Sequence, residues 1–124
     1  MASAEVADLM NRVRQPFNCN NLAIAAAAAA LGDEEFVARS YALNRAGMEQ
    51  IVAGLKRLRY AHIPSSGNFL AFKAGDAAAL NQKLLKQGVI VRPVAGYGMP
   101  EWLRVTIGSE NENARFLEAL ELAQ

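Results

Sequence analysis

The chain has 124 residues, of which 52% are hydrophobic and 20% are charged, and this composition is typical of one globular domain. Thirteen lysines and arginines against twelve acidic residues give a net charge of +1, which argues against a nucleic-acid or membrane partner recruited by overall charge. The single cysteine, Cys19, has no partner for an internal disulfide, and no charged segment followed by an apolar one opens the chain. We therefore expect a cytoplasmic protein.

Two short helices are expected near the start of the chain. Ser3 can cap a helix over residues 4–13, and Asn20 or Asn21 can cap a second helix that ends at Gly32. The second helix contains "LAIAAAAAAL", which is well short of the roughly 20 residues that cross a bilayer. Because it is apolar all round, we expect some of the elements that cover it to lie outside these 124 residues.

A long helix is expected to begin after Asp33 and to end at about Arg59. Gly47 and Gly54 lie inside it, and each costs roughly 1 kcal/mol relative to alanine, so tertiary contacts must compensate or the helix must bend. The apolar stripe that should face the core consists of Val37, Tyr41, Met48, Ile51 or Val52, Leu55 and Leu58.

The remaining pattern predicts an α+β layer. Strands are expected over residues 68–74, 89–94 and 103–108, with one helix capped by Asp76 and closed by Gly88, and a last helix that begins with a Ser109–Glu112 capping box and buries Phe116, Leu117, Leu120 and Ala123. The expected fold class is α+β, with a small mixed or antiparallel sheet of three to four strands and helices on one face.

One strand carries an arginine in an apolar run. In "LRVTIG", Leu103 and Val105 point to one face because side chains alternate along a strand, and Arg104 points to the other. Arg92 lies in the neighbouring strand "VIVRPV". Two guanidinium groups on one face can bind a carboxylate or a phosphate in bidentate fashion. The alternative is that both arginines are merely solvated on the open face of a one-sided sheet.

Nothing in the chain supplies a complete catalytic set. The glycines near the two arginines, together with Tyr97 and Trp102, favour a loop that faces a ligand. His62 and Cys19 have no catalytic partner nearby in the sequence, and no spacing typical of a metal site or a phosphate-binding loop occurs. The residues alone indicate a small α+β domain with a candidate anion clamp.

The segments "RQPFNCNNLAIAAAAAAL", "SSGNFLAF", "GVIVRPV" and "YGMPEWLRVTIGSENENARFLEAL" follow one another along essentially the whole chain. This succession resembles the C-terminal portion of histidinol-phosphate aminotransferases, which are fold-type I pyridoxal-phosphate enzymes. The resemblance implies that Arg104 anchors the phosphate of histidinol phosphate or the carboxylate of glutamate, and that Arg92 is a second arginine at the same anionic end. It also implies that Asn68 and Tyr97 border the cleft.

The resemblance further implies that this chain is a fragment. Pyridoxal phosphate would be bound by a missing large domain, because the Schiff-base lysine and the cofactor-phosphate ligands of the family precede the matched region. Residues 1–32 would link to that domain, residues 33–124 would form the small domain, and the parent enzyme would be a homodimer. The alternatives are the small domain of another class I/II aminotransferase, or a non-catalytic α+β module that binds an anionic metabolite.

Overall fold

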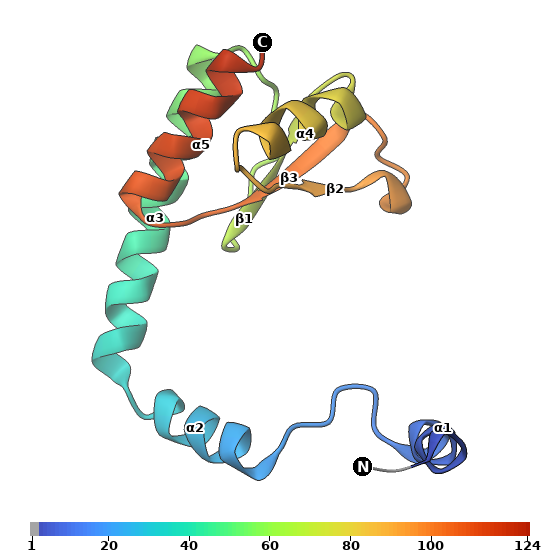
Figure 1. Ribbon diagram of the computed structural model, residues 1–124. Helices are drawn as coiled ribbons and strands as arrows, with labels where there is room; N and C mark the ends of the chain where they lie inside the picture. The colour runs from blue at the N-terminus through green and yellow to red at the C-terminus, as the bar shows by residue number, and fades with distance from the viewer. Residues whose placement is uncertain (1–2) are drawn as a thin grey trace. The chain divides into compact units, whose positions relative to one another are not determined.

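The computed structural model describes residues 3–124 (Figure 1). Its internal contacts divide the chain into two units, Met1–Val37 and Ala38–Gln124. No helix in the described residues is both long enough and apolar enough to span a membrane.

The first unit contains two capped helices, α1 and α2, neither of which has a buried residue. Helix α1 spans Ala4–Val13, and the Ser3 hydroxyl accepts a hydrogen bond from its first turn, at 3.3 Å. Helix α2 spans Asn21–Leu31, and the Asn20 side chain accepts one from the backbone amide of Ala23, at 2.8 Å. Both helices were predicted from the sequence. Every residue of α2 is exposed, including its leucines and isoleucine.

The second unit is built on a three-stranded antiparallel sheet in the order β1-β3-β2, which confirms the predicted fold class. Strand β1 spans Phe69–Lys73 and the central strand β3 spans Trp102–Thr106. Strand β2 is only Arg92–Pro93, and a short 3-10 helix, η1, follows it at Ala95–Tyr97.

The predicted strand over residues 89–94 is wrong in its first half. Gly88 adopts a left-handed conformation, and the amide of Val89 donates to the carbonyl of Leu84 at 3.0 Å, which ties the start of this segment to the end of helix α4 (Ala77–Lys86). The segment therefore pairs with β3 only from Arg92 onward, and the Ile90 side chain is left 83% exposed.

Three helices cover one face of the sheet: α3 (Glu34–Arg57), α4 and α5 (Glu110–Leu122). Alternate residues of β1 and β3 point toward them, as the period of a strand requires. The main buried side chains of this core are Ile51, Leu55, Leu58, Leu70, Phe72, Leu80, Leu84, Leu103, Val105, Phe116 and Leu120. The Ser109–Glu112 capping box that was predicted for α5 is present.

The predicted apolar stripe of α3 is buried only in its C-terminal half. Ile51 and Leu55 are fully buried, whereas Val37 and Tyr41 are exposed. The reason is that the core formed with the sheet and α5 takes its α3 residues from the C-terminal half of that helix.

Gly47 and Gly54 mark where α3 approaches its neighbours most closely, which confirms that tertiary contacts compensate for them. A Cβ atom at Gly47 would lie 2.6 Å from Ile107 Cγ2, 2.7 Å from Asn113 Nδ2 and 3.2 Å from the carbonyl oxygen of Gly108. At Gly54 the three nearest atoms all belong to the side chain of Leu117, the closest at 2.3 Å. Helix α3 can approach this closely only without side chains at these positions.

We expect Gly47→Ala to lower the free energy of unfolding by about 1–3 kcal/mol, because the new methyl group meets backbone and a buried amide that cannot move away. Gly54→Ala is the matched control and should cost less, since Leu117 is only half-buried and can change rotamer. Urea unfolding of both variants tests this. If each variant instead gained the roughly 1 kcal/mol that helix propensity offers alanine over glycine, the close packing would be disproved.

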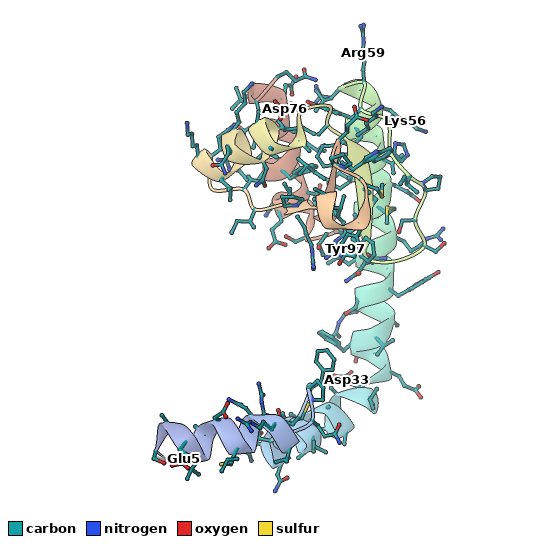
Figure 2. All side chains as sticks on the ribbon, turned by 90° about the vertical axis from the view of Figure 1, so that its right-hand side faces the viewer. Glu5, Asp33, Lys56, Arg59, Asp76 and Tyr97 are labelled. Carbon is teal, nitrogen blue, oxygen red and sulfur yellow. The ribbon has the colours of Figure 1, made fainter. Side chains whose placement is uncertain are left out.

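Helices α3 and α4 end in the same left-handed turn, but with different residues at the critical position. Arg59 has φ 62° and Gly88 has φ 75°. After Arg59, the amide of Tyr60 donates back to the carbonyl of Leu55 at 2.8 Å, as in a Schellman motif. The Arg59 side chain projects away from the fold (Figure 2). An arginine therefore holds a conformation that normally favours glycine.

Arg59→Gly should unfold with a free energy about 1 kcal/mol higher than Arg59→Ala, because both changes remove the charge but only glycine adopts this φ without strain. Thermal or urea unfolding of the two variants measures the difference. Equal stabilities would show that the turn relaxes out of the left-handed region.

Candidate functional site

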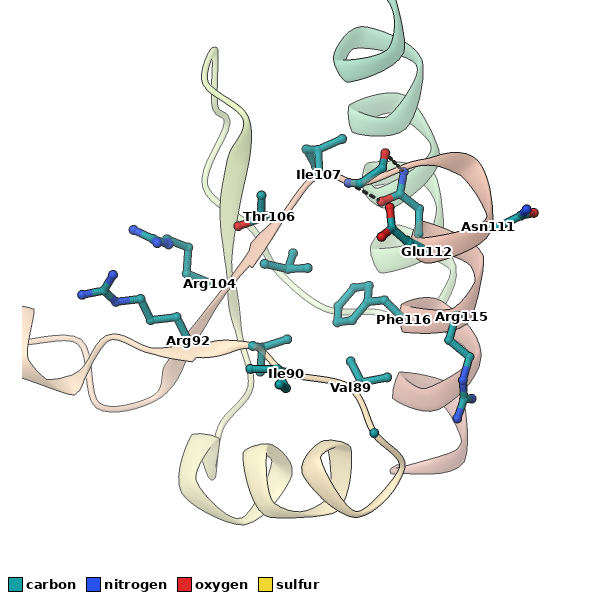
Figure 3. Close-up of a pocket in the computed structure, with 15 residues that line it drawn as sticks. Val89, Ile90, Arg92, Arg104, Thr106, Ile107, Asn111, Glu112, Arg115 and Phe116 are labelled. Atoms are coloured by element: carbon teal, nitrogen blue, oxygen red, sulfur yellow. Dashed lines mark hydrogen bonds between the residues drawn. The ribbon is translucent and has the colours of Figure 1, made fainter. Parts of the chain in front are cut away.

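Arg92 and Arg104 lie directly opposite one another on neighbouring antiparallel strands. The register pairs Arg92 of β2 with Arg104 of β3, so both side chains leave the sheet on the face away from the helices. Figure 3 shows the two guanidinium groups side by side and pointing the same way. Like charges directly opposite each other across two strands destabilise a sheet unless something negative lies between them.

Arg104 lies against an aromatic ring rather than an acid. Its Cζ atom is 4.5 Å from the centroid of the Phe69 ring, within the range of a cation–π interaction. Its Nε atom is buried and has no hydrogen-bond partner. The side chain as a whole is half-buried.

Arg92 contacts Tyr97, which comes from η1. The Arg92 Nη2 group donates to the Tyr97 hydroxyl at 3.4 Å, and both side chains are exposed. Gly98, in a left-handed conformation with φ 76°, ends η1. The structure therefore brings together three of the four residues proposed from sequence: Arg92, Tyr97 and Arg104.

Asn68 is not brought to this group. Asn68 immediately precedes β1, and its backbone carbonyl accepts a hydrogen bond from the amide of Ile107 at 2.8 Å. Its side chain is exposed and lines neither of the two cavities that include Arg104.

Two cavities meet at Arg104. The smaller, of 320 Å³, is an apolar pocket on the open face of the sheet, whose lining includes Ile63, Phe69, Val94, Tyr97 and Met99. The larger, of 850 Å³, is a groove between β3, the segment before β2 and the start of α5 (Figure 3). A ligand held by Arg104 can therefore extend into an apolar pocket on one side and a more polar groove on the other.

Sequence reasoning missed Asn113, which fixes the end of β3. This side chain is only 2% exposed, and its Oδ1 accepts from the amide of Gly108 at 3.0 Å while its Nδ2 donates to the carbonyl of Gly108 at 3.1 Å. One amide thus satisfies both backbone groups of the turn between β3 and α5. The only signal in the sequence is a glycine just before a capping box, which does not indicate a buried asparagine.

Phe69 was also missed, because its role depends on register. Ala71 is the residue of β1 paired with Arg104, and Phe69 is the diagonal neighbour on the same face. Diagonal neighbours in a sheet are within reach of aromatic and long side chains.

Glu112 lines the groove and is held by the capping box. The backbone amide of Ser109 donates to its Oε2 at 2.8 Å, and the Ser109 hydroxyl makes a second hydrogen bond to the same oxygen. These hydrogen bonds lower the pKa of Glu112 below its ordinary value of 4.5. The bond from the Ser109 backbone has the larger effect on this pKa, and the bond from the Ser109 side chain has the smaller one.

Because the folded pKa is lowered, Glu112 stabilises the fold above pH 4.5, and this contribution is lost as the pH falls through the folded pKa. We therefore expect the difference in unfolding free energy between the wild type and Glu112→Gln to be constant near neutral pH and to shrink below pH 4.5. Glu110→Gln, in the same helical turn, controls for the general effect of removing an acid. A difference that does not change with pH would disprove the role of the carboxylate.

Known proteins that resemble this chain are aminotransferases. The sequence model of the family "Aminotransferase class I and II" matches residues 1–120. Histidinol-phosphate aminotransferase 1 of Dechloromonas aromatica is 77% identical over 123 residues, which are 99% of this chain and 34% of that protein. Histidinol-phosphate aminotransferase of Methylobacillus flagellatus is 64% identical over 121 residues, 98% of this chain and 33% of that protein.

The solved structures give the same fold. The crystal structure of histidinol-phosphate aminotransferase from Sinorhizobium meliloti in complex with pyridoxal-5'-phosphate matches with a TM-score of 0.76 at 23% identity, over 96% of this chain and 34% of that chain. This chain spans 34% and 33% of the length of the two curated relatives. From the match of the family model over residues 1–120, the chain belongs to the class I and II aminotransferases.

Proposed function

We propose that this chain is the anion-binding part of a histidinol-phosphate aminotransferase, which transfers an amino group between glutamate and the histidinol phosphate pair. The curated relatives at 77% and 64% identity bear that name. The observation that carries the proposal is the pairing of Arg92 with Arg104 on the open face of the sheet. In this proposal residues 33–124 are the small domain and residues 1–32 the link to a large one.

The charge of the two arginines is available for a ligand. Among the described residues, no carboxylate forms an ion pair with either arginine, whereas Arg57 is paired with Glu121 at 2.8 Å. A phosphate between two guanidinium groups removes their mutual repulsion and accepts several charge-assisted hydrogen bonds. Arg104 would hold the phosphate of histidinol phosphate, or the carboxylate of glutamate in the other half-reaction, with Arg92 beside it. Tyr97 and Asn68 are proposed as bordering residues, and the contact of Tyr97 with Arg92 supports the first of these.

The residues of this chain do not fit a pyridoxal-phosphate site. When bound, this cofactor supplies the electron sink for amino transfer and requires a lysine to hold it. Lys73 lies 3.4 Å from Glu101 in an ion pair, and Lys83 donates to the carbonyl of Ala123 at 2.7 Å. No lysine lines either cavity at Arg104. We therefore propose that the cofactor is bound by the large domain of the enzyme, outside this chain.

The exposed apolar residues of the first unit support docking onto another part of the enzyme. Helices α1 and α2 are too short to be stable alone in water, since isolated helices of fewer than about 12–15 residues are marginal. Leu9, Met10, Leu22 and Ile24 are all exposed. We propose that these helices pack on the large domain, that the complete enzyme is a homodimer, as the family resemblance implies, and that it is cytoplasmic, as expected from the sequence.

The test is a chimera in which this chain replaces the matching segment of the Dechloromonas aromatica enzyme, to which it is 77% identical. Arg104→Ala should lower kcat/KM for histidinol phosphate with 2-oxoglutarate, mainly by raising KM. The loss of a charge-assisted contact should cost about 2–4 kcal/mol of binding free energy. Arg92→Ala should act in the same direction. Arg57→Ala is the matched control, because Arg57 lines neither cavity at Arg104 and is already paired with Glu121 at 2.8 Å.

Three outcomes would contradict the proposal. An inactive chimera beside an active parent would favour a non-catalytic module. Preference for an aromatic amino donor over histidinol phosphate would indicate another class I/II aminotransferase. An unchanged KM in Arg104→Ala would remove Arg104 from the site.

A further inference from the structure

We propose that Phe69 is a positioning residue for Arg104: its ring holds the guanidinium group in place without neutralising its charge. This inference rests on the proposed function, in which Arg104 binds the anionic end of the substrate. Its structural basis is the 4.5 Å distance between Arg104 Cζ and the centroid of the Phe69 ring.

The register of the sheet makes this contact possible. The residue directly opposite Arg104 on β1 is Ala71, whose methyl group leaves room on the open face. Phe69 stands two residues away on the same strand and the same face, opposite Thr106. The long arginine side chain can therefore lie diagonally across Ala71 and reach the ring.

An aromatic ring beside the Arg104 guanidinium group affects anion binding differently from a carboxylate in the same place. Arg57 and Arg115, in the same unit, are held by Glu121 and Glu118 respectively, at 2.8 Å and 3.4 Å. A carboxylate occupies the guanidinium N–H groups and cancels the charge that an anionic ligand would need. An aromatic face attracts the cation through its quadrupole and leaves the N–H groups at the edge of the guanidinium free to donate.

The hydrogen bonding of Arg104 supports this assignment. Nε is buried and has no partner, so no hydrogen bond at that atom fixes the orientation of the side chain. The contact that orients the charged end is with the Phe69 ring, which is 40% exposed and lines the apolar pocket that Arg104 also lines. Loss of the ring should leave Arg104 in the sheet but free to change rotamer, which lowers affinity for the anion through lost preorganisation.

The experiment measures the affinity of the chimera for inorganic phosphate as a competitive inhibitor, alongside KM and kcat for histidinol phosphate. Phe69→Leu should raise both the inhibition constant of phosphate and KM about tenfold, and should change kcat little. Phe69→Tyr keeps an aromatic face and should restore both values to near those of the wild type. Phe69→Met is the second variant without a ring, and its unbranched, flexible side chain can adapt to the site should Phe69→Leu fail to fold.

A double-mutant cycle separates positioning from packing. In an Arg104→Ala background, Phe69→Leu should have no further effect on the phosphate inhibition constant, because the group it positions is already absent. An additional loss of the same size in that background would overturn the proposal, since Phe69 would then act through general packing.

Failure of this inference can be told apart from failure of the proposed function. If Arg104→Ala weakens phosphate inhibition while both ringless variants match the wild type, Phe69 does not position Arg104 and the anion site stands. If Arg104→Ala itself leaves phosphate inhibition and KM unchanged, the proposed function fails and this inference fails with it.

Discussion

The buried side-chain amide of Asn113 is the constraint on which the second unit depends. It donates to and accepts from Gly108, so the chain leaves β3 and enters α5 with both backbone groups of the turn satisfied. Gly47 of α3 packs against the same amide, because a Cβ atom there would lie 2.7 Å from it. A strand and two helices therefore meet at one polar group, and leaving any of these hydrogen bonds unmade in the interior costs about 1–3 kcal/mol.

This fixed end of β3 also determines where the candidate site lies. Strand β3 is central in the sheet, so its inner residues, Leu103 and Val105, are held by the core while Arg104 leaves on the other face. Strand β1 supplies the aromatic neighbour of Arg104, and β2 supplies the second arginine. The site is thus assembled across three strands rather than on a flexible loop, which favours a fixed geometry for the two charges.

Much of this architecture follows from local sequence signals. Alternation predicted the face of Arg104, and capping residues such as Ser109 placed the helix starts. The first half of the strand predicted over residues 89–94 was wrong, because apolar composition does not reveal that the end of α4 holds Val89 away from β3. The contact of Phe69 with Arg104 could not be predicted either, since it depends on a register between segments more than thirty positions apart in the sequence.

The opposed arginines tie correct folding to ligand recognition. A slip of one residue between β3 and its neighbours would turn Leu103 and Val105 toward solvent and Arg104 into the apolar core, because side chains alternate with a period of two. Such a slip would bury an unpaired charge, so the slipped register is strongly disfavoured. A molecule in which the arginines are misaligned is therefore also one that is poorly folded, and selection for a stable core preserves the spacing of the anion site even where no ligand is present.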